Sequence, residues 1–221
     1  MVGCLGRLDE LQTPLDPAET PGVERMAPVR LREYVAGRTA ARRALLALTG
    51  AGAAVPRNPD RSPAWPAGVG GSLSHSRRYA VAVAARTDRW RSVGVDLEEA
   101  SRLGRELWPE VMTAEDLVLL EGMAGPEAVR AATLRFCARE ACFKCLEGAW
   151  PGCCAGLAPQ AFRVRVAGEG ASFSVVVPVV EGGPEVRGSY AAFDGHWLVL
   201  CGLPAGDAWP AARQGRDGLI C

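Results

Sequence analysis

The stretch from Pro126 to Gly148 constrains the fold of this chain most, because its two ends mark one long helix. Proline is favoured in the first turn of a helix and glycine just past its end. Phe136, Glu140 and Lys144 follow at intervals of four residues, so they share one face of that helix. A carboxylate beside an ammonium is either a working site or a plain stabilising ion pair, and spacing alone leaves both open.

Composition draws further attention to Lys144. It is the only lysine among the 25 lysine and arginine residues. A lysine ammonium is compact and mobile, whereas an arginine guanidinium is a rigid planar fork, so the two are not interchangeable. Codon usage alone could explain the arginine bias, but the retained lysine makes Lys144 an early target for mutation.

The overall composition is that of an ordinary globular protein. The chain has 221 residues, 48% of them hydrophobic, and a formal net charge of zero, which suits one large domain or two small ones. Neutrality argues against broad nucleic-acid binding. No apolar run approaches the ~18 residues of a membrane span, and Arg7, Asp9 and Glu10 stand where a signal peptide needs apolar residues. We therefore expect a cytoplasmic protein with no membrane or nucleic-acid partner.

Eight cysteines raise the question of a metal site. Cys142 and Cys145 form a C-x-x-C pair, and Cys153 and Cys154 follow soon after. There is no second C-x-x-C pair, and the chain has only two histidines. We expect thiols that pack as small hydrophobic groups in a reducing compartment, with a zinc site as the alternative.

Arginines crowd a predicted helix over residues 28–49. Arg38 and Arg42 are four residues apart, so they can point together and hold a phosphate through forked hydrogen bonds. A solvated basic face is the alternative. The connection over residues 51–71 is rich in glycine and proline and carries Arg57, and connections of this length are often functional.

A glycine- and serine-rich segment follows over residues 70–76. It contains Ser74 and His75 and offers N–H groups, hydroxyls and an imidazole to an anion. A polar turn explains the same composition equally well.

A strand with clean alternation is predicted over residues 93–98. Asp96 and Glu98 face one side of it, about 7 Å apart along the strand. Two carboxylates beside a glycine suit Mg²⁺ with a phosphate ligand. An exposed acidic strand end is the alternative.

The remaining segments complete the expected layout. Residues 1–27 are predicted to be loop-like because prolines and a glycine break any period. The last third is expected to be β-rich, and Asp194-Gly195 is a strong hairpin signal. The predicted strands besides 93–98 cover residues 79–85, 162–167, 173–180, 186–193 and 196–203.

Four of these segments, taken in order, resemble blocks of the larger, monomeric class of 4'-phosphopantetheinyl transferases, of the type that activates enterobactin and surfactin synthetases. The blocks are the basic helix over 32–42, the segment over 63–76, the Gly-x-Asp-x-Glu motif over 94–98 and the Glu-Lys helix over 136–144. Any one block is weak evidence, but four in the right order are specific. The resemblance runs from about residue 15 to about residue 202.

The resemblance implies an α+β fold of two similar α/β halves in a pseudo-two-fold arrangement, each a small antiparallel sheet packed on a long helix. We expect an N-terminal half over residues 1–105 and a C-terminal half over residues 106–221, with the site in the cleft between them. It also implies an enzyme that transfers the 4'-phosphopantetheine group of coenzyme A to a serine of an apo acyl, peptidyl or aryl carrier protein, releasing 3',5'-ADP. Such carriers serve polyketide, nonribosomal peptide and siderophore synthesis.

The resemblance also assigns roles to particular residues. Glu140 and Lys144 are the expected catalytic pair, Lys144 steadying phosphate charge and Glu140 acting as metal ligand, as base, or as base through water. Mg²⁺, with Mn²⁺ as a substitute, is expected on Asp96, Glu98 and Glu140. The residues expected to bind coenzyme A are Arg38, Arg42, Arg57, Ser74, His75, Arg139 and Lys144.

One residue departs from the family pattern. The family usually has lysine immediately before the helix glutamate, and this chain has Arg139. We interpret the change as a tolerated charge swap, although the larger forked head could shift phosphate geometry and lower activity. Two alternatives stay open: a catalytically weak relative that binds coenzyme A, and an unrelated Mg²⁺-dependent phosphotransferase. The chain has no P-loop G-x-x-x-x-G-K-[ST], which counts against the commonest fold of the second kind.

Overall fold

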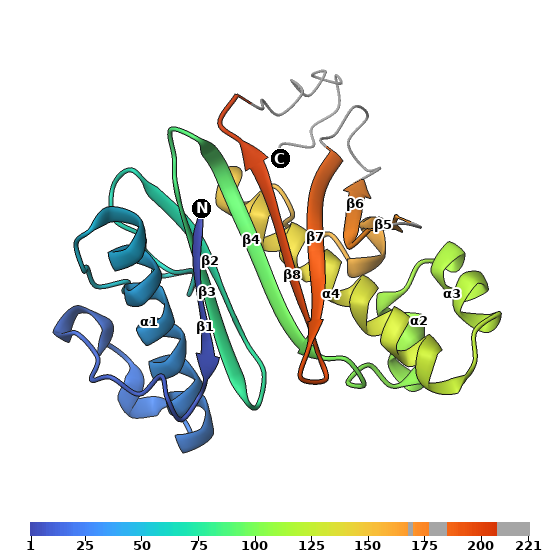
Figure 1. Ribbon diagram of the computed structural model, residues 1–221, viewed down its shortest axis with the longest axis horizontal. Coiled ribbons are helices and arrows are strands. Elements are labelled where there is room, and N and C mark those ends of the chain that lie inside the picture. The colour runs from blue at the N-terminus through green and yellow to red at the C-terminus, as the bar shows by residue number, and fades with distance from the viewer. Residues whose placement is uncertain (168–169, 177–184, 207–221) are drawn as a thin grey trace.

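The computed structural model describes residues 1–167, 170–176 and 185–206. It has an α+β fold with two antiparallel sheets, each packed on one long helix (Figure 1). The first sheet has the strand order β1-β3-β2, and the second has the order β4-β8-β7-β6-β5. The elements are β1 (Val2–Arg7), α1 (Pro28–Thr49), β2 (Val69–His75), β3 (Tyr79–Arg86), β4 (Trp90–Glu99), α2 (Trp108–Val111), α3 (Ala114–Glu121), α4 (Gly125–Ala149), β5 (Arg163–Val166), β6 (Ser172–Val176), β7 (Glu185–Phe193) and β8 (His196–Pro204), with short 3₁₀ turns at Pro17–Glu19, Val23–Arg25, Arg105–Leu107 and Pro159–Ala161.

Helix α1 covers the first sheet and confirms the helix predicted over residues 28–49. It starts with Pro28 in the first turn and ends at Gly50, whose φ of 76° is the left-handed conformation typical of a helix end. Ala36, Ala40 and Ala44 recur at intervals of four and are fully buried against β3. Small side chains in this row let the helix lie close to the strand.

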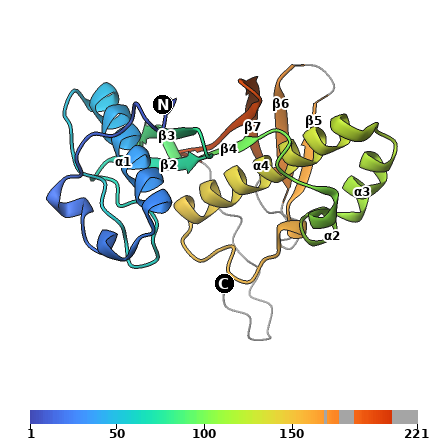
Figure 2. The same ribbon diagram turned by 90° about the horizontal axis from the view of Figure 1, so that it is seen from below.

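Helix α4 covers the second sheet, with α2 and α3 gathered near its N-terminal end (Figure 2). It packs against β4 at Gly94, where an added Cβ atom would lie 1.9 Å from the carbonyl oxygen of Ala141. Only glycine therefore permits the helix to lie this close to the strand. The close approach brings Glu140 and Lys144 of α4 next to Asp96 of β4.

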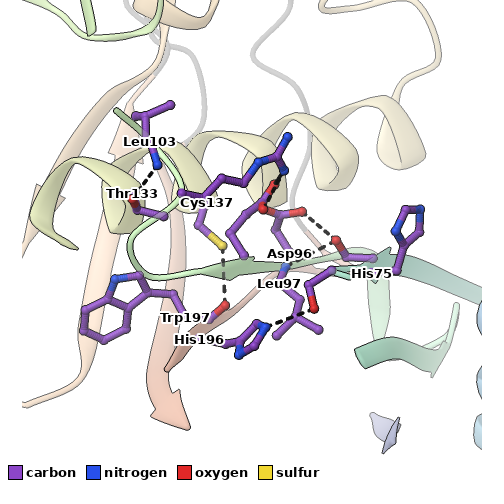
Figure 3. Close-up of polar contacts among 12 residues, drawn as sticks. His75, Asp96, Leu97, Leu103, Thr133, Cys137, His196 and Trp197 are labelled. Carbon is purple, nitrogen blue, oxygen red and sulfur yellow. Dashed lines mark hydrogen bonds and ion pairs between the residues drawn. The ribbon is translucent and has the colours of Figure 1, made fainter. Parts of the chain in front are cut away.

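The two sheets meet through an apolar layer and through serine hydroxyls. Buried valine, alanine and leucine side chains of β3, β4 and β8 form the layer. Strands β2 and β4 belong to different sheets, and their hydrogen bonds run through side chains. Ser72 of β2 accepts the N–H of Val95 at 3.1 Å. Ser74 accepts the N–H of Leu97 at 3.2 Å (Figure 3). Hydroxyl oxygens thus take the place that carbonyl oxygens have in an ordinary sheet.

A third serine extends this joint to the start of β8. Ser76 shares a hydrogen bond of 3.0 Å with Nε2 of His196, while Nδ1 of the same ring donates to the carbonyl of Asp194 at 2.8 Å. Because that carbonyl can only accept, the neutral ring accepts from the serine hydroxyl. Three alternate serines of one segment therefore reach into the second half of the chain.

One expectation about local structure was wrong, and one alternative is excluded. Residues 1–27 are not all loop, because Val2–Arg7 pairs with β3 along the edge of the first sheet. Residues 70–76 are not a polar turn, because most of them form β2, in which glycines are needed for packing. At Gly71 an added Cβ atom would lie 2.4 Å from the Trp65 ring and 2.4 Å from the carbonyl oxygen of Val83.

The β-rich last third is confirmed where it can be described. The hairpin between β7 and β8 turns at Asp194 and Gly195, which both have positive φ, as the predicted turn requires. The end of the strand predicted over 173–180 lies outside the described residues. No described helix is both long enough and apolar enough to cross a membrane.

The division at residue 105 stays a prediction, but the strand over 93–98 does not belong to the sheet of the first half. Strand β4 hydrogen-bonds to β8 throughout its length. The chain therefore passes from the first sheet to the second in the turn between β3 and β4.

Candidate active site

A cleft of about 1280 Å³ lies between α1 and the 57–63 connection on one side and β4 and α4 on the other. Most of the predicted site residues line it, namely Arg38, Arg57, Ser74, His75, Asp96, Glu98, Glu140 and Lys144. Arg42 and Arg139 are not among the lining residues. The cleft is basic on the α1 side and acidic on the side of β4 and α4.

The acidic end is built from two strand residues and one helix residue. Asp96 and Glu98 of β4 are 3% and 8% exposed, and Glu140 lies across from them on α4. Burial raises the pKa of Glu98, against the opposing effect of Arg102, which donates to both its oxygens at 2.6 and 2.7 Å. Burial, together with the charge of Asp96, also raises the pKa of Glu140. Desolvated carboxylates that lie close together favour a proton or a cation.

The donor set at this end fits a hard divalent cation. Within the described residues, Oδ2 of Asp96 is buried without a hydrogen-bond partner, and an unsatisfied buried carboxylate oxygen is a ready ligand. Three carboxylates give the all-oxygen set that Mg²⁺ prefers. Their oxygens do not yet converge, since the described residues contain no such trio within 4.8 Å of one another at this position. Instead, Lys144 and Arg102 neutralise Asp96 and Glu98.

The side-chain hydrogen bonds of Lys144 link α4 to β4 and β2 and do not run to other residues of α4. Its Nζ donates to Oδ1 of Asp96 at 2.7 Å, to the carbonyl of Val95 at 3.3 Å and to Ser74 at 3.4 Å. Burial by itself lowers the pKa of an ammonium, but the charges of Asp96 and Glu140 outweigh it, so the pKa of Lys144 is raised. The residue is therefore a half-buried cation at the acidic end of the cleft, and its ion pair with a residue 48 positions away is not a simple helix-surface pair.

The basic end rests on one face of α1. Arg38 is 4% exposed, and its guanidinium carbon lies 4.6 Å from the centre of the Tyr34 ring; that of Arg57 lies 5.3 Å from the same ring. Nε of Arg38 is buried without a hydrogen-bond partner among the described residues. Two guanidinium groups on one ring, one of them unsatisfied, leave donors for a bound anion.

His75 sits beside this basic face at the end of β2 (Figure 3). Burial lowers the pKa of His75, and the nearby charge of Arg30 acts in the same direction against that of Glu33. The neutral ring accepts from Arg30 through Nε2 at 2.5 Å. Sequence reasoning missed Arg30 and Tyr34 as lining residues, although both share the four-residue spacing of Arg38.

Arg42 was assigned to coenzyme A, and its contacts point to a different role. Its guanidinium forms an ion pair with Glu19, which is fully buried and also accepts the N–H of Val55 at 2.9 Å. It donates further to Thr13 at 2.7 Å and to the carbonyl of Pro14 at 2.9 Å. Arg42 thus holds the N-terminal connection on α1, and spacing alone could not reveal this because Glu19 lies 23 residues away.

Arg139 was also assigned to coenzyme A, and it too lies outside the cleft. Its side chain is 1% exposed, forms an ion pair with Asp116 and donates through Nε to the carbonyl of Phe162 at 2.9 Å. Asp116 is the third residue of α3, and its carboxylate completes the capping box by accepting the N–H of the N-cap residue Thr113. Arg139 therefore ties α3 and the start of β5 to α4, and its role on coenzyme A stays a prediction.

Two family models match successive parts of the chain. Residues 18–85 match the 4'-phosphopantetheinyl transferase N-terminal domain, and residues 92–176 match the 4'-phosphopantetheinyl transferase superfamily. The two matches meet between β3 and β4, where the sheets also divide.

Individual proteins are similar over most of the chain. The 4'-phosphopantetheinyl transferase Npt of Nocardia iowensis is 29% identical over 198 residues, which covers 85% of each chain. The 4'-phosphopantetheinyl transferase Svp of Streptomyces mobaraensis is 30% identical over 214 residues, which covers 90% of this chain and 83% of the relative. Among solved structures, a holo-(acyl-carrier-protein) synthase of Bacillus anthracis in complex with CoA (3',5'-ADP) covers 52% of this chain and 97% of its own, with 17% identity and a TM-score of 0.42.

Proposed function

Because this chain belongs to the 4'-phosphopantetheinyl transferases, we propose that it transfers the 4'-phosphopantetheine group of coenzyme A to a serine of an apo acyl or peptidyl carrier protein, with Mg²⁺, and releases 3',5'-ADP. Membership of this family makes the chain a transferase, and the substrates and the metal are what we propose. Action as a monomer in the cytoplasm is part of the same proposal, supported by the resemblance of the sequence.

The observation that carries the proposal is the division of charge along one cleft. Coenzyme A is a long ligand with a 3'-phosphate near its nucleoside and a diphosphate further along. The basic end of the cleft offers Arg38 and Arg57 for the 3'-phosphate through charge-assisted hydrogen bonds. Neutral His75 lies between the two ends, where its imidazole would donate to a phosphate oxygen.

The acidic end would hold the metal. Asp96, Glu98 and Glu140 supply carboxylate oxygens, and the unsatisfied Oδ2 of Asp96 is the strongest sign of a missing partner. Mg²⁺, or Mn²⁺ in its place, would neutralise the charge of the diphosphate and polarise its phosphorus.

The reaction itself needs a proton acceptor and a fixed positive charge. The serine oxygen bonds to the β-phosphorus while the bond from that phosphorus to the bridging oxygen breaks, and 3',5'-ADP departs with the bridging oxygen. The serine proton passes to Glu140, directly or through one water. Burial suits Glu140 to this role because it raises the pKa of the carboxyl. Lys144, held by Asp96 and Val95, steadies the negative charge that grows on the phosphoryl oxygens.

The test is the intact mass of an apo carrier protein after incubation with this chain and coenzyme A. A gain equal to one phosphopantetheine, present with Mg²⁺ and absent with EDTA, is the expected result. Asp96→Asn should abolish the gain at unchanged fold. A matched control is Asp88→Asn, since Asp88 is an exposed carboxylate in the β3–β4 turn that pairs with Arg86.

Two outcomes would contradict parts of the proposal. Full turnover by Asp96→Asn in Mg²⁺ would remove the metal assignment. No mass gain on acyl and peptidyl carriers, with coenzyme A binding still measurable by calorimetry, would favour a relative that binds coenzyme A without transferring it.

A further inference from the structure

The two cysteine motifs lie on different segments of the chain. Cys142 and Cys145 are fully buried on the face of α4 that packs against the second sheet, in one apolar cluster with Cys201. They act as small hydrophobic groups, as the composition led us to expect. Cys153 and Cys154 lie in the connection that follows α4, where Cys154 belongs to the same apolar cluster and Cys153 packs against it. The transfer reaction gives them no role.

That connection is folded back over the last turn of α4 by one carboxylate. Glu147 accepts the N–H of Gly152 through one oxygen and the N–H of Cys154 through the other, both at 2.7 Å. Gly152, with a φ of 85°, supplies the left-handed residue that this tight turn requires. The carboxylate and the two thiols are thereby brought together by a chain segment of only eight residues, 147–154.

We propose that Glu147, Cys153 and Cys154 bind one borderline-soft divalent cation of the Zn²⁺ class, at a site separate from the coenzyme A cleft. Their ligand atoms all lie within 4.8 Å of one another, which is true of no other trio of histidine, cysteine or acidic residues in the described part of the chain. The two sulfur atoms are 3.5 Å apart. A tetrahedral Zn²⁺ with bonds of about 2.3 Å to each sulfur needs about 3.8 Å between them. The thiols therefore need to move by only a few tenths of an ångström.

The donor set selects the cation. Two sulfur ligands favour Zn²⁺ or Cd²⁺ over Mg²⁺, which prefers oxygen. Cys154 is 3% exposed, whereas Glu147 and Cys153 are half-buried, so solvent can reach a fourth position. None of these residues lines the cleft that holds the carboxylates proposed for Mg²⁺.

Binding at this site exchanges protons for the cation. Burial, and then the contacts with Cys153 and Glu147, raise the pKa of the Cys154 thiol. The cation takes the place of the proton on the Cys154 sulfur when it binds. Affinity therefore increases with pH.

The experiment titrates the reduced full-length protein with Cd²⁺ in excess Mg²⁺. Cd²⁺ is the probe because its bonds to thiolates absorb in the near ultraviolet. We expect one Cd²⁺ per chain, displaced by Zn²⁺ but not by Mg²⁺. Cys153→Ser should lower the affinity by about tenfold or more, as expected for loss of a metal-site group, and Glu147→Gln should lower it as well. Cys4→Ser, which removes a half-buried thiol of the first sheet, should leave binding unchanged.

Either of two results would overturn the site. One is equal Cd²⁺ affinity in the wild-type protein and in Cys153→Ser. The other is a wild-type titration that does not saturate near one cation per chain, and this result does not depend on any variant folding. Phosphopantetheine transfer is not the readout, so failure of the proposed function leaves this test intact.

Discussion

Replacing Arg139 distinguishes a role in the fold from a role on coenzyme A. The side chain is buried, with bonds to Asp116 and to the carbonyl of Phe162. Asp116 also pairs with Arg135, whose Nε donates to it at 3.1 Å. One cationic partner therefore remains when Arg139 is removed.

The magnitude follows from these contacts. Removing one partner of a buried ion pair costs about 3–5 kcal/mol. Because Arg135 stays, we expect Arg139→Met to cost about 3 kcal/mol for the charge and about 1 kcal/mol for the Phe162 carbonyl. Arg139→Lys keeps the charge but loses the fork, which costs about 1–2 kcal/mol. For a chain of this size each kcal/mol lowers Tm by about 2–4 °C, which gives about 8–16 °C for Arg139→Met and about 2–8 °C for Arg139→Lys.

The assay combines thermal and urea unfolding with KM for coenzyme A, measured well below the Tm of each variant. We expect both variants to lose stability in this order and to keep the wild-type KM. Arg86→Met is the matched control, since its pair with Asp88 is exposed and screened by solvent and should contribute little to stability. An Arg139→Met protein with wild-type Tm and a raised KM for coenzyme A would refute the reasoning and return Arg139 to the cleft.

Three further predictions concern the site and the joint between the sheets. Arg38→Ala should weaken the binding of coenzyme A by about 10- to 100-fold, since a charged hydrogen bond contributes about 1.5–3 kcal/mol, whereas the binding of dephospho-coenzyme A should change little. Equal losses of affinity for the two ligands in calorimetry would contradict the assignment of Arg38 to the 3'-phosphate. Burial raises the pKa of Glu140 above 4.5, so a proton on Glu140 stabilises the metal-free fold at low pH, and this contribution is lost as the pH rises through the raised pKa. Mg²⁺ affinity should increase over the same pH range, and an affinity measured by calorimetry that does not change with pH would contradict this. Ser72→Ala leaves the buried N–H of Val95 without its partner and should cost about 1–3 kcal/mol in urea unfolding, whereas Ser72→Thr keeps the hydroxyl and should cost less.

Sequence reasoning succeeded where local geometry decides the outcome. Alternation along a strand fixes that Asp96 and Glu98 share a side, and spacing along a helix fixes the same for Glu140 and Lys144. These four residues all line the cleft. Local rules were enough because each motif needed only its own element to be identified correctly.

It failed where a side chain takes its partner from elsewhere in the chain. Spacing suggested that Arg42 points in the same direction as Arg38, but Arg42 forms an ion pair with the buried Glu19. The family pattern suggested a phosphate contact for Arg139, but Asp116 binds it in the core of the second half. Strand β2 was missed for a related reason, since its glycines lower β propensity and are required only by neighbours that the sequence does not reveal.

Because the side chains of Ser72 and Ser74 join β2 to β4, substitutions at these serines can change the width of the cleft. An ordinary ladder fixes the spacing of two strands through the backbone, which no substitution changes. Here Ser72 and Ser74 hold the strand of His75 against the strand of Asp96 through side chains alone. Lengthening one of these side chains would alter the separation of the basic and acidic ends of the cleft while both sheets kept their register. Such a protein could accommodate ligands of different reach, or exchange one half for that of a relative, by changing a few residues along a single seam.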